Sequence, residues 1–342
     1  MKKLARAALC VGAAFAIPAV INAAIARNRH DLGMILPGEE GEYGWLLGRI
    51  HYQVRGTGEP LVLVHGIGAG SSSYEFRYNF DALSEHYKVY AYDLPGFGQS
   101  ERRNQTYTAE MMTLAMMDFL RDVVKEPAHI VASSLSAAHA IQLAARHPEL
   151  VKSLVVICPT GIQDLVQRVP VLSQLAYGAF SLPAIGTSLY NCIASYSYIE
   201  KFLKENVYYD VAMVTPALVE QNYQSAHRDN GQYVLRSFIS GLLNCDVAPV
   251  YPHLRQPIFV AWGRQTRITP VEHARDFYEQ HAHARLRIFE NSRLLPHNEE
   301  AEDFNAAVLS FLGSASKPSA IELVSASSLP LSELTAAPEL QP

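Results

Sequence analysis

The sequence predicts an α/β protein with a mostly parallel central sheet, flanking helices and a helical cap. Short apolar runs at residues 61–64, 87–92, 130–132 and 154–157 have the composition of strands buried on both faces of a sheet. Segments with helical periodicity, at 108–124 and 137–146, alternate with these runs, as expected for right-handed parallel connections. Residues 161–256 lack such runs and are rich in tyrosine, which predicts an all-helical cap.

Length and composition limit the classes of function. At 342 residues and 49% hydrophobic content, the chain suits one α/β domain with an insertion. The net charge is -5 and the basic residues are scattered, so we expect no nucleic-acid partner. The four cysteines lie far apart without a C-x-x-C pair, which argues against a zinc site or a disulfide framework. We expect neither a metal nor a cofactor.

Both ends of the chain differ in composition from its body. A basic cluster precedes an uncharged run at 7–26, which is about as long as a bilayer-spanning helix requires. Ala24-Ile25-Ala26 also has the pattern of a cleavage site, so residues 1–28 are predicted to be a signal peptide or a membrane anchor. An intact anchor makes the protein membrane-associated, and cleavage makes it exported. Residues 314–342 are rich in Ser, Ala and Pro and predict a flexible tail.

The body begins with elements that lead to a glycine-rich turn. Residues 43–54 alternate polar and apolar side chains and, with a turn at 56–58, predict a leading antiparallel hairpin. The strand at 61–64 ends in HGIGAG, residues 65–70, where backbone N–H groups can approach a ligand. The phosphate-binding patterns G-x-x-x-x-G-K-[ST] and G-x-G-x-x-G both fail here, which favours an oxyanion loop.

The next strand, 87–92, is followed by a turn dense in Pro and Gly that begins with Asp93. Two interpretations of Asp93 stay open. It is a catalytic acid at a strand end, or an acid that accepts hydrogen bonds from the loop backbone. Further along, strands are predicted at 257–262 and 286–289 and a closing helix at 301–312. The core therefore comprises residues 43–160 and 257–313.

Residues 130–138, IVASSLSAA, predict a nucleophile on a strand-to-helix turn. Such a turn holds the central serine hydroxyl above the sheet, beside free backbone N–H groups. Ser134 is the predicted nucleophile. Ala132 and Ser136 occupy the glycine positions of the usual G-x-S-x-G frame.

Several motifs together resemble the α/β-hydrolase family, in the same order: HGIGAG, DLPGFGQS, the turn around Ser134 and ARHPELVKSLVVICPTG. The chain is similar in particular to a membrane-associated subgroup with an S-S-L-S nucleophile elbow, and the resemblance spans roughly residues 52–312. It implies a serine hydrolase similar to carboxylic ester hydrolases, with a cap that shapes an apolar substrate pocket. It also implies an oxyanion hole at the N–H groups of Ile67 and Leu135, with Gly66 beside them.

The resemblance breaks at the two partners of the serine. Serine attacks only when a histidine accepts its proton and a carboxylate orients that histidine. In similar proteins the acid ends a W-G-x-x-D turn, where this chain has Thr266, and the histidine stands in G-H-x-P-H-x-E, where it has Leu294. The sequence therefore predicts a degenerate triad.

Three hypotheses follow. In the first, His297 replaces the lost base from one helical turn away, about 5 Å, which requires a remodelled loop. In the second, Ser134 works in an atypical site with Asp93 or with a cap residue; the cap candidates are Asp164, His227 and Asp246. In the third, the fold remains without hydrolysis.

The histidines near the nucleophile motifs, His65 and His139, are interpreted as a loop-bonding and a packed residue. The preferred function is hydrolysis of an ester or related bond of a small apolar substrate through Ser134. The alternative is a catalytically impaired protein that acts in ligand binding or regulation.

Overall fold

The computed structural model describes residues 20, 22–25, 27, 30, 33, 35–166, 171–182, 184–281 and 283–315. Most of the predicted signal or anchor segment therefore lies outside the described residues. The predicted tail does too, apart from residues 314 and 315, which end helix α12 (Ala301–Ala315). Among the helices described, none combines the length and the apolar character needed to cross a bilayer.

An eight-stranded sheet forms the centre of the protein, in the order β1-β2-β4-β3-β5-β6-β7-β8. From β4 to β8 neighbouring strands are parallel, whereas β1 and β2 pair antiparallel with each other and β2 with β4. This confirms the predicted fold class. The strands are β1 (Glu39–Trp45), β2 (Gly48–Arg55), β3 (Pro60–Val64), β4 (Lys88–Tyr92), β5 (Ala128–Ser133), β6 (Val151–Ile157), β7 (Ile258–Gly263) and β8 (Ala284–Phe289).

The leading hairpin is present, but its turn differs from the predicted one. Trp45 pairs with Gly48, so residues 46 and 47 form the turn between β1 and β2. The segment at 56–58 instead connects β2 to β3. Gly56 has a φ of +86°, and a Cβ there would stand 2.2 Å from Tyr87 O and 2.3 Å from Ser84 O. Glycine is therefore required by close approach rather than by a hairpin turn.

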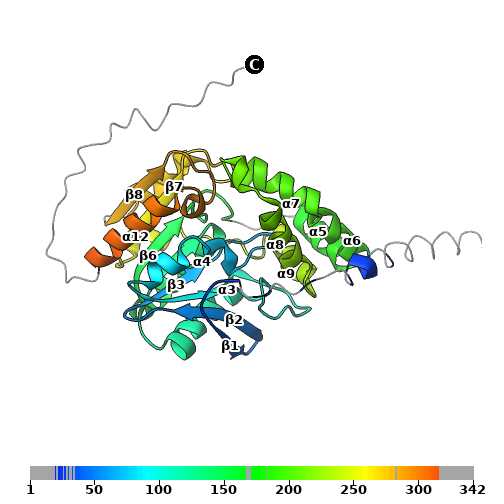
Figure 1. Ribbon diagram of the computed structural model, residues 1–342, viewed down its shortest axis with the longest axis horizontal. Coiled ribbons are helices and arrows are strands. Elements are labelled where there is room, and N and C mark those ends of the chain that lie inside the picture. The colour runs from blue at the N-terminus through cyan, green and yellow to red at the C-terminus, as the bar shows by residue number, and fades with distance from the viewer. Residues whose placement is uncertain are drawn as a thin grey trace, which may run out of the picture.

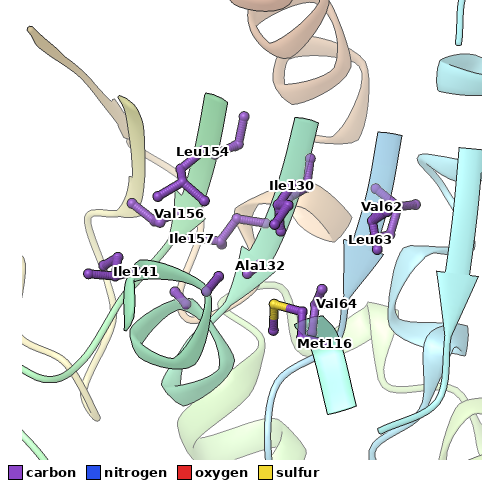
Figure 2. Close-up of a cluster of buried hydrophobic side chains, with 14 of the residues drawn as sticks. Val62, Leu63, Val64, Met116, Ile130, Ala132, Ile141, Leu154, Val156 and Ile157 are labelled. Atoms are coloured by element: carbon purple, nitrogen blue, oxygen red, sulfur yellow. The ribbon is translucent and has the colours of Figure 1, made fainter. Parts of the chain in front are cut away.

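The main apolar core lies between the central strands and the helices on either face of the sheet. Figure 2 shows Val62, Ile130 and Leu154 from three adjacent strands, with Met116 of α3 (Ala109–Phe119) and Ile141 of α4 (Leu135–Arg146) packed beside them. These side chains are inaccessible to solvent. Continuous burial explains why the strands read as unbroken apolar runs in the sequence.

Other helices connect or flank the strands. They are η1 (Ser73–Phe76), α2 (Phe80–Ser84), the π-helical turn η2 (Leu120–Val124), η3 (Pro148–Leu150), η6 (Tyr251–His253), η7 (Val271–His273), α10 (Ala274–Glu279) and α11 (Pro296–Glu299).

Between β6 and β7 the described residues form helices and no strand. They comprise α5 (Val171–Ser181), α6 (Ile185–Ile193), α7 (Tyr196–Phe202), η4 (Leu203–Val207), η5 (Val211–Met213), α8 (Pro216–His227) and α9 (Gly231–Ile239), called the cap helices below. They gather on one side of the sheet (Figure 1) and share an apolar cluster of their own, which includes Tyr190, Ile199 and Leu218. A Cβ on Gly70 would stand 2.3 Å from Asn222 O, so α8 lies directly on the glycine-rich loop.

Candidate active site

Ser134 occupies the sharp turn between β5 and α4. Its backbone has φ 54° and ψ -125°, a conformation that costs a non-glycine residue about 1–3 kcal/mol. The Ser134 N–H donates to Ile157 O at 2.8 Å, which fixes the turn to the end of β6. The side chain is half-buried. This strained geometry, held by neighbouring strands, is that of a nucleophile elbow.

The small residues around Ser134 allow the glycine-rich loop to contact the elbow. Ser136 Oγ donates to His65 O at 2.6 Å and so connects α4 to the end of β3. A methyl group on Gly66 would stand 3.4 Å from Ser133 Oγ and 3.6 Å from Ser134 Cβ. The loop backbone therefore lies beside the serine, as an oxyanion loop requires.

Two of the three predicted oxyanion residues have a free N–H. Leu135 is the first residue of α4, so its amide has no acceptor within the helix. In the described part of the chain, the Ile67 amide donates to no acceptor either. The Gly66 N–H, by contrast, donates to Glu75 Oε2 at 2.9 Å. The candidate oxyanion donors are therefore Ile67 and Leu135, and the Gly66 amide is removed from the predicted set.

Thr266 and Leu294, the two positions at which the sequence predicts a degenerate triad, lie on adjacent loops. Gln265 N donates to Ser292 O at 2.9 Å, which holds the loop after β7 against the loop after β8. Thr266 is buried, with its Oγ1 3.4 Å from Thr269 Oγ1. Leu294 is half-buried and packs against both apolar clusters. The usual acid and base positions thus hold a hydroxyl and an alkyl group, neither of which can accept the serine proton at neutral pH.

Leu294 belongs to a loop that is attached to the cap helices as well as to the sheet. Its N–H donates to Val207 O at 3.1 Å, at the end of η4. Arg293 Nη1 donates to the carbonyls of Lys204, Glu205 and Tyr208, at 2.7, 3.1 and 2.8 Å. The loop that carries the base in similar proteins therefore has a structural role here, because it connects the cap helices to the core.

His297 does not reach Ser134 in the structure. Its ring is fully buried, with its centroid 5.1 Å from that of Phe76 and 5.6 Å from that of Phe304. Its Nε2 is directed to Glu75 Oε1 at 3.2 Å, an ion-pair distance without hydrogen-bond alignment. Within the described residues no hydrogen bond joins His297 and Ser134. Its polar neighbour in the structure is Glu75, and its role as a substitute base stays a prediction.

Glu75 is a site residue that the sequence analysis missed. Its carboxylate lies between Gly66 N–H and His297, and a methyl group on Gly66 would stand 3.4 Å from Oε2. Burial alone would raise the pKa of Glu75, but His297, His65 and the Gly66 N–H together hold it below its ordinary value. A fixed negative charge therefore lies next to the elbow. The only sequence signal was one acidic residue within an apolar, aromatic segment, which is too common a pattern to identify it.

Asp93 accepts hydrogen bonds from the loop backbone, which favours the loop-bonding interpretation, while its role as a catalytic acid stays a prediction. Its carboxylate accepts hydrogen bonds from Ser73 N at 2.7 Å and Gln99 N at 2.8 Å, and lies 3.4 Å from His51 Nδ1. A Cβ on Gly98 would overlap it, at 2.2 Å from its Cγ. Burial alone would raise the pKa of Asp93, but His51, His65 and the two N–H groups outweigh burial and hold the pKa below its ordinary value. The Asp93 carboxylate therefore stays ionised.

The two histidines near the motifs also have structural roles. His65 Nδ1 lies 2.7 Å from Gly66 O, and its Nε2 accepts from Leu94 N at 3.1 Å, so it bonds the loops as expected. His139 Nε2 lies 2.9 Å from Leu243 O. Burial lowers the pKa of His139 to about 4, which makes it a neutral packed residue at physiological pH.

The three cap candidates for an atypical site have other partners. Asp164 Oδ2 lies 2.7 Å from His273 Nδ1, and the His227 ring stacks on Tyr223 at 4.1 Å between centroids. Asp246 is exposed and accepts from Ala248 N. Among the described residues, none of these groups has a hydrogen bond to Ser134.

A cavity of about 570 Å³ lies near the amino end of β4, whereas Ser134 lies at the carboxyl ends of the parallel strands. It is lined by Tyr52, Lys88 and Tyr90, at the start of β4 and along β2, whereas Ser134 follows the carboxyl end of β5. Parallel strands place these ends on opposite edges of the sheet. This cavity is therefore not the substrate pocket expected under the cap.

A sequence profile described as the alpha/beta hydrolase fold matches residues 59–297, most of the chain. The chain belongs to the α/β-hydrolase family. The matched range includes the glycine-rich loop, the elbow and the loop with Leu294.

Comparison with individual proteins agrees with this assignment. This α/β-hydrolase is 30% identical over 278 residues to a 2-hydroxy-6-oxononadienedioate/2-hydroxy-6-oxononatrienedioate hydrolase of Paraburkholderia phymatum, covering 78% of the chain and 91% of that protein. It is 25% identical over 274 residues to a hydrolase of the same name from Comamonas testosteroni, covering 77% and 91%. A solved serine hydrolase of carbazole degradation superposes with a TM-score of 0.67 at 21% identity, covering 81% of the chain and 99% of that structure, which shows the shared fold.

Proposed function

We propose that this α/β-hydrolase is a weak serine hydrolase that cleaves an ester or related bond of a small apolar substrate through Ser134. The observation that carries the proposal is the strained elbow at Ser134, with the N–H groups of Ile67 and Leu135 free beside it. Strain of this kind persists where the surrounding structure maintains it, and it is concentrated at functional sites. The relatives named as hydrolases support hydrolysis as the general class of reaction.

The proposed reaction proceeds without an imidazole base. Ser134 Oγ attacks the substrate carbonyl carbon, its proton passes to hydroxide, and the two N–H groups stabilise the resulting oxyanion. The intermediate expels the alcohol, which takes up a proton, and a water molecule then hydrolyses the acyl-serine ester. In hydrolases that lack triad residues, oxyanion stabilisation and binding leave about 10³–10⁴-fold acceleration over water. We therefore expect slow turnover.

A fluorophosphonate probe tests the nucleophile. The full chain should be labelled slowly, with the label on Ser134, and should cleave p-nitrophenyl butyrate. Ser134→Ala should abolish both. Ser133→Ala is the matched control, because Ser133 adjoins Ser134 but ends β5, and it should retain labelling. Labelling elsewhere, or no labelling and no cleavage by the wild type, would refute the proposal.

A second function is favoured by the same two positions that weaken catalysis. Thr266 and Leu294 stand at the predicted acid and base positions, and Arg293 attaches the loop that contains Leu294 to the cap helices. This arrangement suits a ligand-binding protein that keeps its cap closed. If apolar esters raise the melting temperature of the wild type and are recovered uncleaved, this second function replaces the first.

We also propose that residues 7–26 attach the protein to a membrane. The uncharged run behind a basic cluster supports this localisation. The mass of the protein purified from its host tests it, since a mature chain that begins near Arg27 would show that the segment is a cleaved signal peptide.

A further inference from the structure

The cap helices carry an unusually apolar surface. No Asp, Glu, Lys or Arg occurs between residues 169 and 199, which cover α5, α6 and most of α7. More than half of the large apolar side chains exposed in the described residues fall between 171 and 211. Those with the largest exposed fractions are Val171 at 70%, Leu175 at 65%, Val211 at 53%, Leu182 at 51% and Tyr198 at 50%. Such a concentration of exposed apolar side chains in one segment of a folded protein indicates an interaction surface.

Helix α5 is apolar on its outer side. Val171 and Leu175 are four residues apart and therefore lie on one side of the helix, and Leu182 directly follows its last residue. All three are exposed, whereas the polar Ser173 is buried. The outer side of α5 therefore suits an apolar environment.

A second uncharged stretch of the chain meets this surface. Asn22 belongs to the run at 7–26, and its Nδ2 donates to Ala184 O at 3.1 Å and to Ser188 Oγ at 3.2 Å. Asn191 Nδ2 donates in turn to Asn22 Oδ1 at 2.8 Å. Figure 1 shows the described N-terminal residues, in dark blue, beside α6. The two uncharged stretches, more than 140 residues apart in the sequence, are thus joined by hydrogen bonds.

We propose that the outer surface of α5, α6 and α7 rests on a phospholipid bilayer, so that the cap helices face the membrane. An apolar run of about 20 residues that ends on this surface can enter a bilayer only if the surface itself lies close to the membrane. The exposed tyrosines at 196 and 198 are of the type that concentrates at membrane–water interfaces. The helices lie on the bilayer without crossing it, which agrees with their short lengths.

This orientation is tested with the full chain bound to vesicles of phosphatidylcholine and phosphatidylglycerol. A bimane fluorophore is attached at Leu175→Cys on the cap, or at Leu46→Cys on the β1–β2 turn. In both chains the exposed Cys192 is changed to Ser, and so is Cys10. Leu46 is the matched control because its exposed fraction is 84%. Lipids with a spin label on the acyl chain should quench the fluorophore at residue 175 at least about tenfold more strongly than at residue 46.

Two charge variants complete the test. Val171→Glu with Leu182→Glu should abolish quenching at residue 175, because burial of an apolar side chain contributes about tenfold or more to partitioning. Leu46→Glu with Leu47→Glu, in the chain that carries the fluorophore at residue 175, should leave the quenching unchanged. Equal quenching at both positions, or none at residue 175 in chains that float with the vesicles, would overturn the proposal. A stable dimer in detergent-free buffer that shields residue 175 would assign the surface to a second copy of the chain instead.

Discussion

Restoring the two missing partners gives the most informative variant of this protein. Thr266→Asp and Leu294→His place a carboxylate and an imidazole on loops that already touch, through the Gln265 to Ser292 hydrogen bond. A positioned general base contributes about 10²–10⁴-fold to the rate of such reactions. Loss of the half-buried Leu294 side chain should lower the free energy of unfolding by about 1–2 kcal/mol, which leaves the protein folded. We therefore expect ester hydrolysis to rise at least about a hundredfold.

The assay is hydrolysis of p-nitrophenyl butyrate, with the fraction of folded protein followed by circular dichroism. Leu294→Gln with Thr266→Asn is the matched control, because these side chains have similar size but cannot accept a proton in the same way. Adding Ser134→Ala to the restored variant should remove the gain. If the restored variant is folded and hydrolyses no faster than wild type, loss of the triad partners does not account for the weak activity that we propose.

Three further predictions concern the supports of the site. Ser136→Ala removes the hydrogen bond to His65 O and should lower the free energy of unfolding by about 1–2 kcal/mol in urea titrations; no change would contradict that role. Arg293→Met should speed amide hydrogen exchange at residues 204–208 about tenfold or more, while exchange in β5 stays unchanged; equal exchange throughout would show that the loop does not hold the cap helices. His139 has a pKa of about 4 in the folded protein and about 6.5 in the unfolded chain, so between pH 6.5 and pH 4 only the unfolded chain binds the extra proton. The free energy of unfolding should therefore fall by about 2–3 kcal/mol between pH 7 and pH 4.5. His139→Gln should reduce this acid loss, measured by urea titration at pH 7 and pH 4.5, and an unchanged loss would refute it.

The sequence predicts the sheet well because each central strand is buried on both faces. Runs such as 61–64 and 154–157 contain no residue that disagrees with burial, and the structure places them in β3 and β6. The turn of the leading hairpin was misplaced because a glycine at position 56 is typical of a turn. In the structure, Gly56 instead allows the backbone to pass close to the carbonyl oxygens of Tyr87 and Ser84. Glycine alone does not distinguish these two requirements.

The site was only partly predictable. The elbow at Ser134 depends on local backbone geometry, so the small residues next to Ser134 in the sequence were enough to predict it. Glu75 and His297 are 222 residues apart, and their contact arises from the packing of η1 against α11. No local pattern predicts such a contact, so Glu75 was missed and the hypothesis that His297 is the base was formed without its neighbour Glu75. The choice between two roles for Asp93 depended on hydrogen bonds that only the folded loops provide.

The pH dependence of Ser134 acylation tests the central claim most directly. Without an imidazole partner, the rate of fluorophosphonate labelling should rise tenfold per pH unit through neutrality, because the serine proton is lost to hydroxide. A histidine base would instead produce a plateau above its pKa of about 6.5. A steady rise from pH 5.5 to pH 8.5 supports a nucleophile without its usual partners. A plateau in the wild type that disappears in His297→Gln would contradict the account and assign the base to His297.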